Sequence, residues 1–116
     1  MVVLVVDDAV ASSLAAMIRA LRPTWVPLAV ATVEELDVIL SGIAVDVTVV
    51  DLHLRGSSPE QTLAVLDLPR KQTMRVLVVS GDPHALHAAR ERGHRCELKP
   101  ISGDALVAAI EEVARA

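Results

Sequence analysis

The chain has 116 residues, a mass of 12.3 kDa and a net charge of −4, with 11 Lys and Arg against 15 Asp and Glu. This length predicts a single domain, and a hydrophobic content of 53% excludes a disordered chain. The acidic balance argues against a nucleic-acid binder, and no apolar run reaches the roughly 18 residues that a membrane span needs. With a lone cysteine, Cys96, and no signal-like segment, we expect a cytoplasmic protein without an internal disulfide.

Five short apolar runs predict β-strands. Three of them, rich in β-branched residues and leucine, span residues 2–6, 45–50 and 76–79. Such runs are typical of central parallel strands that are covered on both faces. A fourth run, residues 26–31, contains Pro27, which cannot donate a ladder hydrogen bond, and a fifth, residues 95–98, is more polar. These two runs therefore suit the edges of a sheet.

Between the strands, apolar residues recur five times at helical spacing. They are Leu14, Met17, Ile18 and Leu21; Leu36, Ile39 and Leu40; Leu63 and Leu66; Leu86 and Ala89; and Leu106, Ile110 and Val113. Helix-end signals agree with this reading: capping boxes at Thr32 with Glu35 and at Ser58 with Gln61, first-turn prolines at Pro59 and Pro83, and C-terminal caps at Gly42 and Gly93. Five βα units predict an α/β protein with the flavodoxin-like, doubly wound (βα)5 fold, a five-stranded parallel sheet in the order 2-1-3-4-5.

Polar residues follow the strands at the edge where ligands bind in such sheets. Asp7 and Asp8 end the first strand, Asp51 the third, Ser80 and Gly81 the fourth, and Lys99 and Pro100 the fifth. Three carboxylates in one pocket repel each other unless a cation neutralises them, and an all-oxygen donor set suits Mg²⁺ or Mn²⁺. Such an ion orients a phosphoryl group, with Lys99 as a compensating charge and the Ser80 hydroxyl as a donor. Asp51 is then best placed as the nucleophile.

On these residues, and over essentially its whole length, the chain resembles a stand-alone, CheY-like receiver domain of the two-component response regulator family. The resemblance implies that Asp51 accepts phosphate, that Asp7, Asp8, Asp51 and the backbone carbonyl of His53 hold Mg²⁺, and that Lys99 and Ser80 contact the phosphoryl group. It also implies a small residue at Gly81, which keeps the approach to Asp51 open, and a cis peptide bond before Pro100.

The resemblance further implies partners and output. The donor is a histidine kinase or a histidine phosphotransfer protein, and small-molecule phosphodonors are also usable. A downstream protein docks on the face of the fourth helix, fifth strand and fifth helix, with no direct contact to nucleic acid or membrane. We expect residues 1–116 to form one receiver domain without an effector domain. It catalyses its own phosphorylation and dephosphorylation at Asp51 and is otherwise not an enzyme.

The chain departs from the family pattern at three positions. Cys96 occupies the place of a Tyr or Phe whose rotation reports phosphorylation, and no Phe or Tyr exists elsewhere in the sequence. We therefore expect coupling to run through Ser80, the backbone or the helix after Asp82. Arg55 replaces a proline and Pro59 a glycine, which predicts an unusual loop after the third strand.

Two alternative functions remain open. A degenerate receiver binds partners without accepting phosphate, with Asp51 and Lys99 kept as a structural ion pair. The pattern Asp51-x-His53-x-x-Gly56 also fits cobalamin-binding domains, although there it follows the first strand and needs later glycine-rich segments. A haloacid-dehalogenase-like phosphatase is excluded because its Asp-x-Asp spacing is absent after the first strand.

Histidines and arginines cluster late in the chain. His84 and His87 with His94 predict a solvated face rather than a metal site, because no carboxylate or thiol completes a ligand set. Arg90, Arg92 and Arg95 form a basic cluster that we interpret as a docking surface. Cys96 is expected to be a small, buried strand residue.

Overall fold

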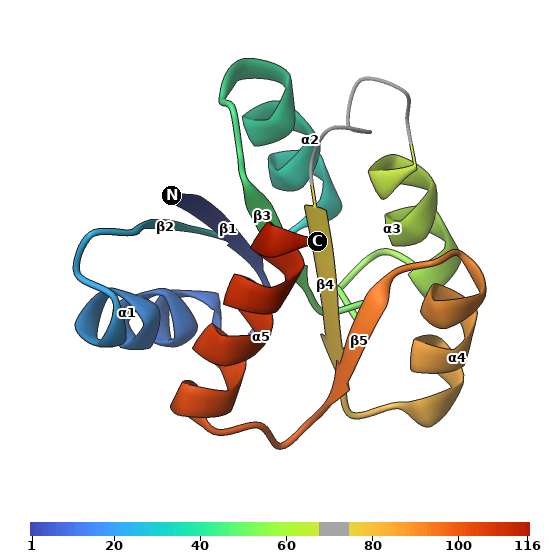
Figure 1. The fold of residues 1–116 in the computed structure, drawn as a ribbon. Coiled ribbons are helices and arrows are strands. Elements are labelled where there is room, and N and C mark those ends of the chain that lie inside the picture. Colours follow the sequence, from blue (N-terminus) through green and yellow to red (C-terminus); the bar gives the residue numbers. More distant parts are fainter. Residues whose placement is uncertain (68–74) are drawn as a thin grey trace.

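The protein is described by a computed structural model that covers residues 1–67 and 75–116. Within these residues, five strands alternate with five helices along the chain (Figure 1). The strands are β1 (Val2–Val6), β2 (Val26–Val30), β3 (Val47–Val50), β4 (Arg75–Ser80) and β5 (Arg95–Leu98). The helices are α1 (Ala11–Leu21), α2 (Val33–Gly42), α3 (Pro59–Leu66), α4 (Pro83–Glu91) and α5 (Gly103–Arg115).

The strands form one parallel sheet in the order β2-β1-β3-β4-β5, which confirms the predicted topology. Chain order reverses between β1 and β3, and in doubly wound sheets the crevice at such a point holds the ligand. The strand with Pro27 and the more polar strand lie at the two edges, as predicted. The sheet therefore brings the carboxyl ends of β1 and β3 side by side.

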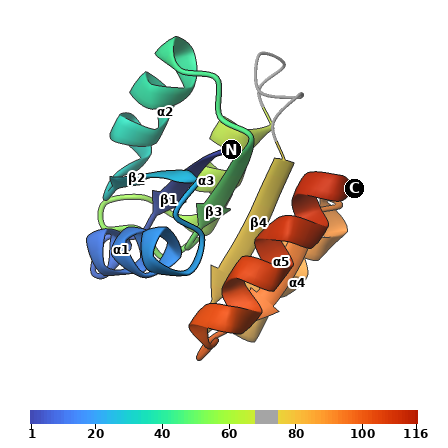
Figure 2. The ribbon, with the colours of Figure 1, turned by 60° about the vertical axis from the view of Figure 1, so that its left-hand side comes forward.

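Helices cover both faces of the sheet (Figures 1 and 2). Alternate residues of each strand point to opposite faces, so Val3 and Val5 pack with α1 and α5, while Leu4 and Val6 pack with the helices on the other face. Both cores are aliphatic: Ile18 and Ile110 are fully buried in the first, and Leu36, Leu52 and Leu63 are buried in the second.

Local signals set most helix ends. Ser58 and Gln61 form the predicted capping box at α3, and Pro59 and Pro83 lie in the first turns of α3 and α4. Gly93 has a φ of +84° just after α4, which confirms it as a C-terminal cap.

The other predicted cap signals need correction. Gly42 is the last residue of α2, and the cap is Ile43 in extended backbone, so the prediction of a glycine cap there is wrong. Thr32 does accept from the Glu35 amide, but the Glu35 carboxylate accepts from the Ala31 amide at 3.3 Å, so only half of that capping box forms.

Strand boundaries differ slightly from the predicted ones. β3 begins at Val47 rather than at residue 45, and just before it the Asp46 carboxylate accepts from the Val2 amide at 2.7 Å. β2 ends at Val30, and β4 extends from Arg75 to Ser80, one residue longer at each end than predicted. None of the helices within residues 1–67 and 75–116 is long and apolar enough to span a membrane.

Candidate phosphoacceptor site

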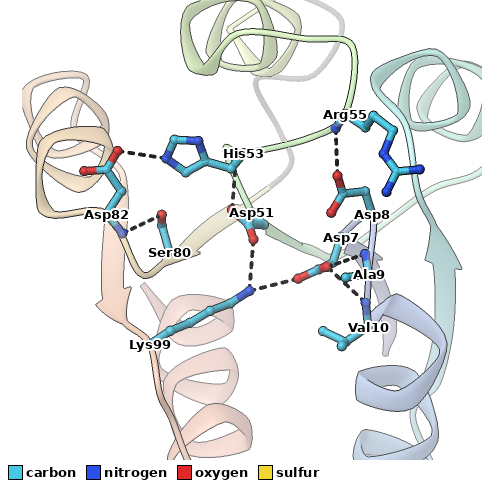
Figure 3. A network of polar contacts seen from close by, with 10 residues as sticks. All are labelled: Asp7, Asp8, Ala9, Val10, Asp51, His53, Arg55, Ser80, Asp82 and Lys99. Atoms are coloured by element: carbon cyan, nitrogen blue, oxygen red, sulfur yellow. Dashed lines mark hydrogen bonds and ion pairs between the residues drawn. The ribbon is translucent and has the colours of Figure 1, made fainter.

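The centre of the site is Lys99, which joins the carboxylates of β1 and β3. Its Nζ lies 2.9 Å from Asp7 Oδ2 and 2.9 Å from Asp51 Oδ2 (Figure 3). The Asp7 and Asp51 side chains are only 4% and 15% exposed, and Lys99 is 31% exposed. The sheet order explains the meeting, because β1 and β3 are neighbours and Lys99 enters from the end of β5, where the Lys99–Pro100 bond is cis as predicted.

Asp7 is held from two directions. Its Oδ2 faces Lys99, while Oδ1 accepts from the amides of Ala9 and Val10 at 2.8 and 3.1 Å. Burial by itself raises the pKa of this carboxyl. The hydrogen bonds from the Ala9 amide, the Lys99 ammonium and the Val10 amide together outweigh burial and lower the pKa. For Lys99, burial lowers the pKa and the bonds to Asp7 and Asp51 raise it, and the net effect is a raised pKa. Both groups therefore stay charged near neutral pH.

Asp8 contacts a different segment from Asp7. Its Oδ2 accepts from the backbone amide of Arg55 at 2.9 Å and so ties the end of β1 to the loop after β3. Figure 3 shows the Asp8 carboxylate turned toward Arg55 rather than toward Lys99. Gly56 follows with a φ of +82°, a conformation that glycine adopts at low cost. Of the three carboxylates that we expected to converge, Asp7 and Asp51 do so at Lys99. Asp8 lies beside them and binds the amide of Arg55 in the loop after β3.

Ser80 and His53 lie on the side of the site that faces α4. The Ser80 side chain is fully buried, and its Oγ accepts from the Asp82 amide at 3.1 Å. The backbone N–H of His53 donates to Asp51 Oδ1 at 2.9 Å, and the His53 imidazole Nε2 lies 2.8 Å from Asp82 Oδ2. The pairing of His53 with Asp82 did not follow from the sequence. The only signals for it were the aspartate before Pro83 and the histidine two residues after Asp51.

An apolar cavity of about 30 Å³ lies beneath the ion-paired centre. Its walls combine Asp7, Asp51 and Lys99 with aliphatic side chains from the α1 and α5 face, among them Leu14, Ile101 and Leu106. The aliphatic walls lower the local dielectric on this side, so the attraction between Lys99 and the two carboxylates is stronger than on the surface.

The oxygen donors at the ends of the strands suit Mg²⁺ in type but are not grouped around one point. Asp7, Asp8 and Asp51 stand at the ends of adjacent strands, followed by the backbone carbonyl of His53, and oxygen-only donors are what Mg²⁺ prefers. In residues 1–67 and 75–116, however, no three His, Cys, Asp or Glu side chains are grouped closely enough to hold a metal ion. The set fits Mg²⁺ in chemical type, and binding requires the carboxylates to turn from Lys99 and the Arg55 amide toward a common point.

The three histidines on and after α4 differ in burial, and one sequence prediction is wrong. His84 and His87 are exposed, as predicted, but His94 is half-buried, and its ring Nε2 lies 3.4 Å from Asp67 Oδ1. The turn at Gly93 explains the burial, since the His94 amide donates back to Ala89 at 3.1 Å and draws the ring inward.

The basic cluster is largely neutralised. Arg92 pairs with Asp67, and Arg95 pairs with Glu97 at 3.1 Å and Glu112 at 2.8 Å. This surface is therefore less positive than the sequence suggests. Cys96 is half-buried in β5, and burial raises the pKa of its thiol.

Comparison with known proteins gives one consistent result. No protein-family model matches this sequence, and no curated protein is similar to it in sequence. Solved structures of receiver domains do match, over nearly the whole chain. The chain therefore has the flavodoxin-like fold of CheY-like response regulator receiver domains.

Three of these structures illustrate the likeness. A CheY-like response regulator receiver protein of Methanospirillum hungatei has a TM-score of 0.84 at 18% identity, over 98% of this chain and 93% of that one. A CheY-like receiver domain of Methylobacillus flagellatus has a TM-score of 0.80 at 21% identity, over 97% and 98%. The chemotaxis protein CheY4 of Vibrio cholerae has a TM-score of 0.82 at 16% identity, over 97% of each chain.

Proposed function

We propose that this chain is a phosphoacceptor receiver of a two-component phosphorelay, with Asp51 as the acceptor. The observation that carries the proposal is the buried contact of Lys99 with both Asp7 and Asp51 at the switch point of a receiver-like sheet. Structural ion pairs occur widely, but here the pair coincides with Asp8 and Ser80 at the ends of the neighbouring strands. This arrangement matches what phosphoryl transfer to a carboxylate needs.

In the proposed reaction, a phosphohistidine of a kinase or phosphotransfer protein presents its phosphorus to an Asp51 oxygen. The O–P bond forms as the N–P bond breaks, and the electron pair returns to the donor's imidazole nitrogen. Lys99 keeps its proton, because its pKa is raised by Asp7 and Asp51, and it offsets the charge on the phosphoryl oxygens. The Ser80 hydroxyl accepts from the Asp82 amide and keeps its own hydrogen to donate to a phosphoryl oxygen.

Asp7, Asp8 and Asp51, with the His53 carbonyl, are the residues we assign to Mg²⁺. When bound, the ion supplies positive charge that offsets repulsion between the carboxylates and the incoming phosphoryl group. We propose that the chain turns over no other substrate: water later hydrolyses the acyl phosphate at Asp51. Its partners are proteins, reached through the face of α4, β5 and α5, and we assign it to the cytoplasm, where such kinases present their phosphohistidine.

A second candidate is a receiver-like module that binds partners without accepting phosphate. The observation in its favour is that Lys99 already satisfies both Asp7 and Asp51, so the ion pair is stable without a metal. We do not propose cobalamin binding, because the Asp51-x-His53-x-x-Gly56 pattern follows β3 and the His53 imidazole is engaged by Asp82.

Intact mass after incubation with acetyl phosphate separates the two candidates. We expect one phosphoryl adduct that requires Mg²⁺ and is missing in Asp51→Asn. Glu60→Gln is the matched control, since Glu60 is an exposed carboxylate on α3. Absence of the adduct from the wild type, together with measurable Mg²⁺ binding, would favour the partner-binding module.

A further inference from the structure

A continuous chain of polar contacts leads from Asp51 to the start of α4 (Figure 3). The His53 amide donates to Asp51 Oδ1 at 2.9 Å, and the His53 imidazole reaches Asp82 Oδ2 at 2.8 Å. The other oxygen of Asp82, Oδ1, accepts from the His84 amide at 2.9 Å and caps α4. One residue, His53, therefore touches the proposed acceptor with its backbone and the cap of α4 with its side chain.

The direction of the central contact is fixed by its chemistry. An ionised carboxylate only accepts hydrogen bonds, so His53 Nε2 carries the hydrogen and donates it to Asp82. The bond from His53 and the amide of His84 hold the pKa of Asp82 below its usual range. Asp82 also donates its own amide to Ser80 Oγ at 3.1 Å. Asp82 is thus connected to both residues that flank the acceptor on this side.

The contact is easily broken, in contrast to the centre of the site. The His53 and Asp82 side chains are 52% and 36% exposed, and exposed ion pairs contribute little to stability. A phosphoryl group on Asp51 brings about two negative charges next to the His53 backbone. It offers the imidazole a more highly charged acceptor than the single charge of Asp82.

We propose that His53 and Asp82 form a latch that reports the state of Asp51 to α4. In the resting protein the imidazole holds Asp82 and so steadies the cap of α4. When Asp51 carries a phosphoryl group, the imidazole turns to it. Asp82 Oδ2 then loses its bond to His53, and the first turn of α4 shifts. The latch supplies a coupling route in a chain that has Cys96 in place of an aromatic switch and contains no Phe or Tyr. This inference rests on the proposed function.

The test follows the backbone amide signals of residues 84–86 by NMR, before and after phosphorylation with acetyl phosphate and Mg²⁺. The variants are His53→Ala, which keeps the backbone donor to Asp51, and Asp82→Asn, which keeps an oxygen to cap α4 but removes the charge. His87→Ala is the control, because His87 lies on the same helix, 71% exposed and paired only with Glu91 in the described structure.

We expect these amide signals to move in the phosphorylated wild type and in His87→Ala. In His53→Ala and Asp82→Asn they start displaced toward the phosphorylated positions, and the further movement is about half of the wild-type value or less. Equal movement in wild type and both latch variants would overturn the latch. So would unmoved signals in wild type that intact mass shows to be phosphorylated. A wild type without any adduct would refute the proposed function and the latch together.

Discussion

The two ion-paired groups at the end of the sheet differ in burial. Asp7, Asp51 and Lys99 form a centre that is mostly enclosed, whereas His53 and Asp82 pair about half in solvent. Buried charges that lose a partner are costly, while exposed pairs exchange with water at little cost. The enclosed centre is therefore expected to keep a fixed geometry, whereas the contact between His53 and Asp82 can break and form again.

Removing the cation from the centre should have the largest effect. Lys99→Met leaves the Asp7 and Asp51 carboxylates next to each other without a cation between them. We expect the free energy of unfolding at pH 7 to fall by about 2 kcal/mol or more, less than for a fully buried pair because Lys99 is partly exposed. Urea unfolding measures this change. Arg90→Met is the control, because Arg90 is an exposed cation on α4. A loss below about 0.5 kcal/mol would mean that the centre behaves like the surface.

Acid should weaken the centre in a defined direction. The pKa of Asp7 is lowered from an ordinary value of 3.8, so its ionised form stabilises the fold above that value, and this stability is lost as pH falls through the lowered pKa. We expect the unfolding free energy of the wild type to decline as pH drops below 3.8, and that of Asp7→Asn to decline less. Parallel pH curves for the two proteins would contradict the assignment of this shift to Asp7.

Alkali should act on the same centre through Lys99. Its pKa is raised above an ordinary value of 10.5, so the ammonium contributes stability below that value that is lost as pH rises through the raised pKa. In urea unfolding from pH 9 upward, we expect the unfolding free energy of the wild type to fall with pH. That of Lys99→Met should fall less, because the variant has no ammonium to lose. If both proteins lose the same amount, Lys99 does not carry the alkaline transition.

Magnesium should stabilise the fold by a smaller amount that depends on Asp8. A ligand that binds only the folded state adds stability in proportion to the logarithm of its concentration, about 1.4 kcal/mol for each tenfold excess over its dissociation constant. We expect Mg²⁺ to raise the thermal midpoint of the wild type and to raise that of Asp8→Asn much less. Ca²⁺ at equal ionic strength serves as the comparison. An equal rise in both proteins would place the ion elsewhere.

The smallest effect is expected at the exposed pairs of α4. Arg92→Ala removes the contact with Asp67, in which both side chains are about two-fifths exposed, and we expect a change in unfolding free energy of about 0.5 kcal/mol. The difference from Lys99→Met measures how much burial adds to an ion pair in this fold. A loss as large as that of Lys99→Met would show that Asp67 anchors α3 and α4 more firmly than its exposure indicates.

Much of the fold followed from the sequence because the strands carry unambiguous apolar runs. The runs at residues 2–6 and 76–79 predicted buried strands, and in the structure both strands are covered on their two faces. The polar strand ends then placed Asp7, Asp51 and Lys99 together, since parallel strands end at one edge. The metal and phosphoryl roles of these residues stay predictions.

Contacts that depend on side-chain direction could not be predicted. The position of Asp8 in the sequence does not predict that its side chain turns to the Arg55 amide, because a carboxylate after a strand can face either the pocket or the next loop. His94 was predicted in solvent because the sequence does not show how sharply the turn at Gly93 reverses. The prediction of Gly42 as a cap was wrong because Gly42 is still helical and Ile43 is the capping residue.

The most direct measurement is to locate the phosphoryl group on the chain. Borohydride reduces an acyl phosphate to an alcohol and releases phosphate, so an aspartyl phosphate becomes homoserine at the same position. After treatment with acetyl phosphate and Mg²⁺, peptide mass mapping should find homoserine at residue 51 and aspartate at residues 7 and 8. Homoserine at another aspartate, or unmodified aspartate at residue 51, would contradict the assignment of Asp51 as the phosphoacceptor.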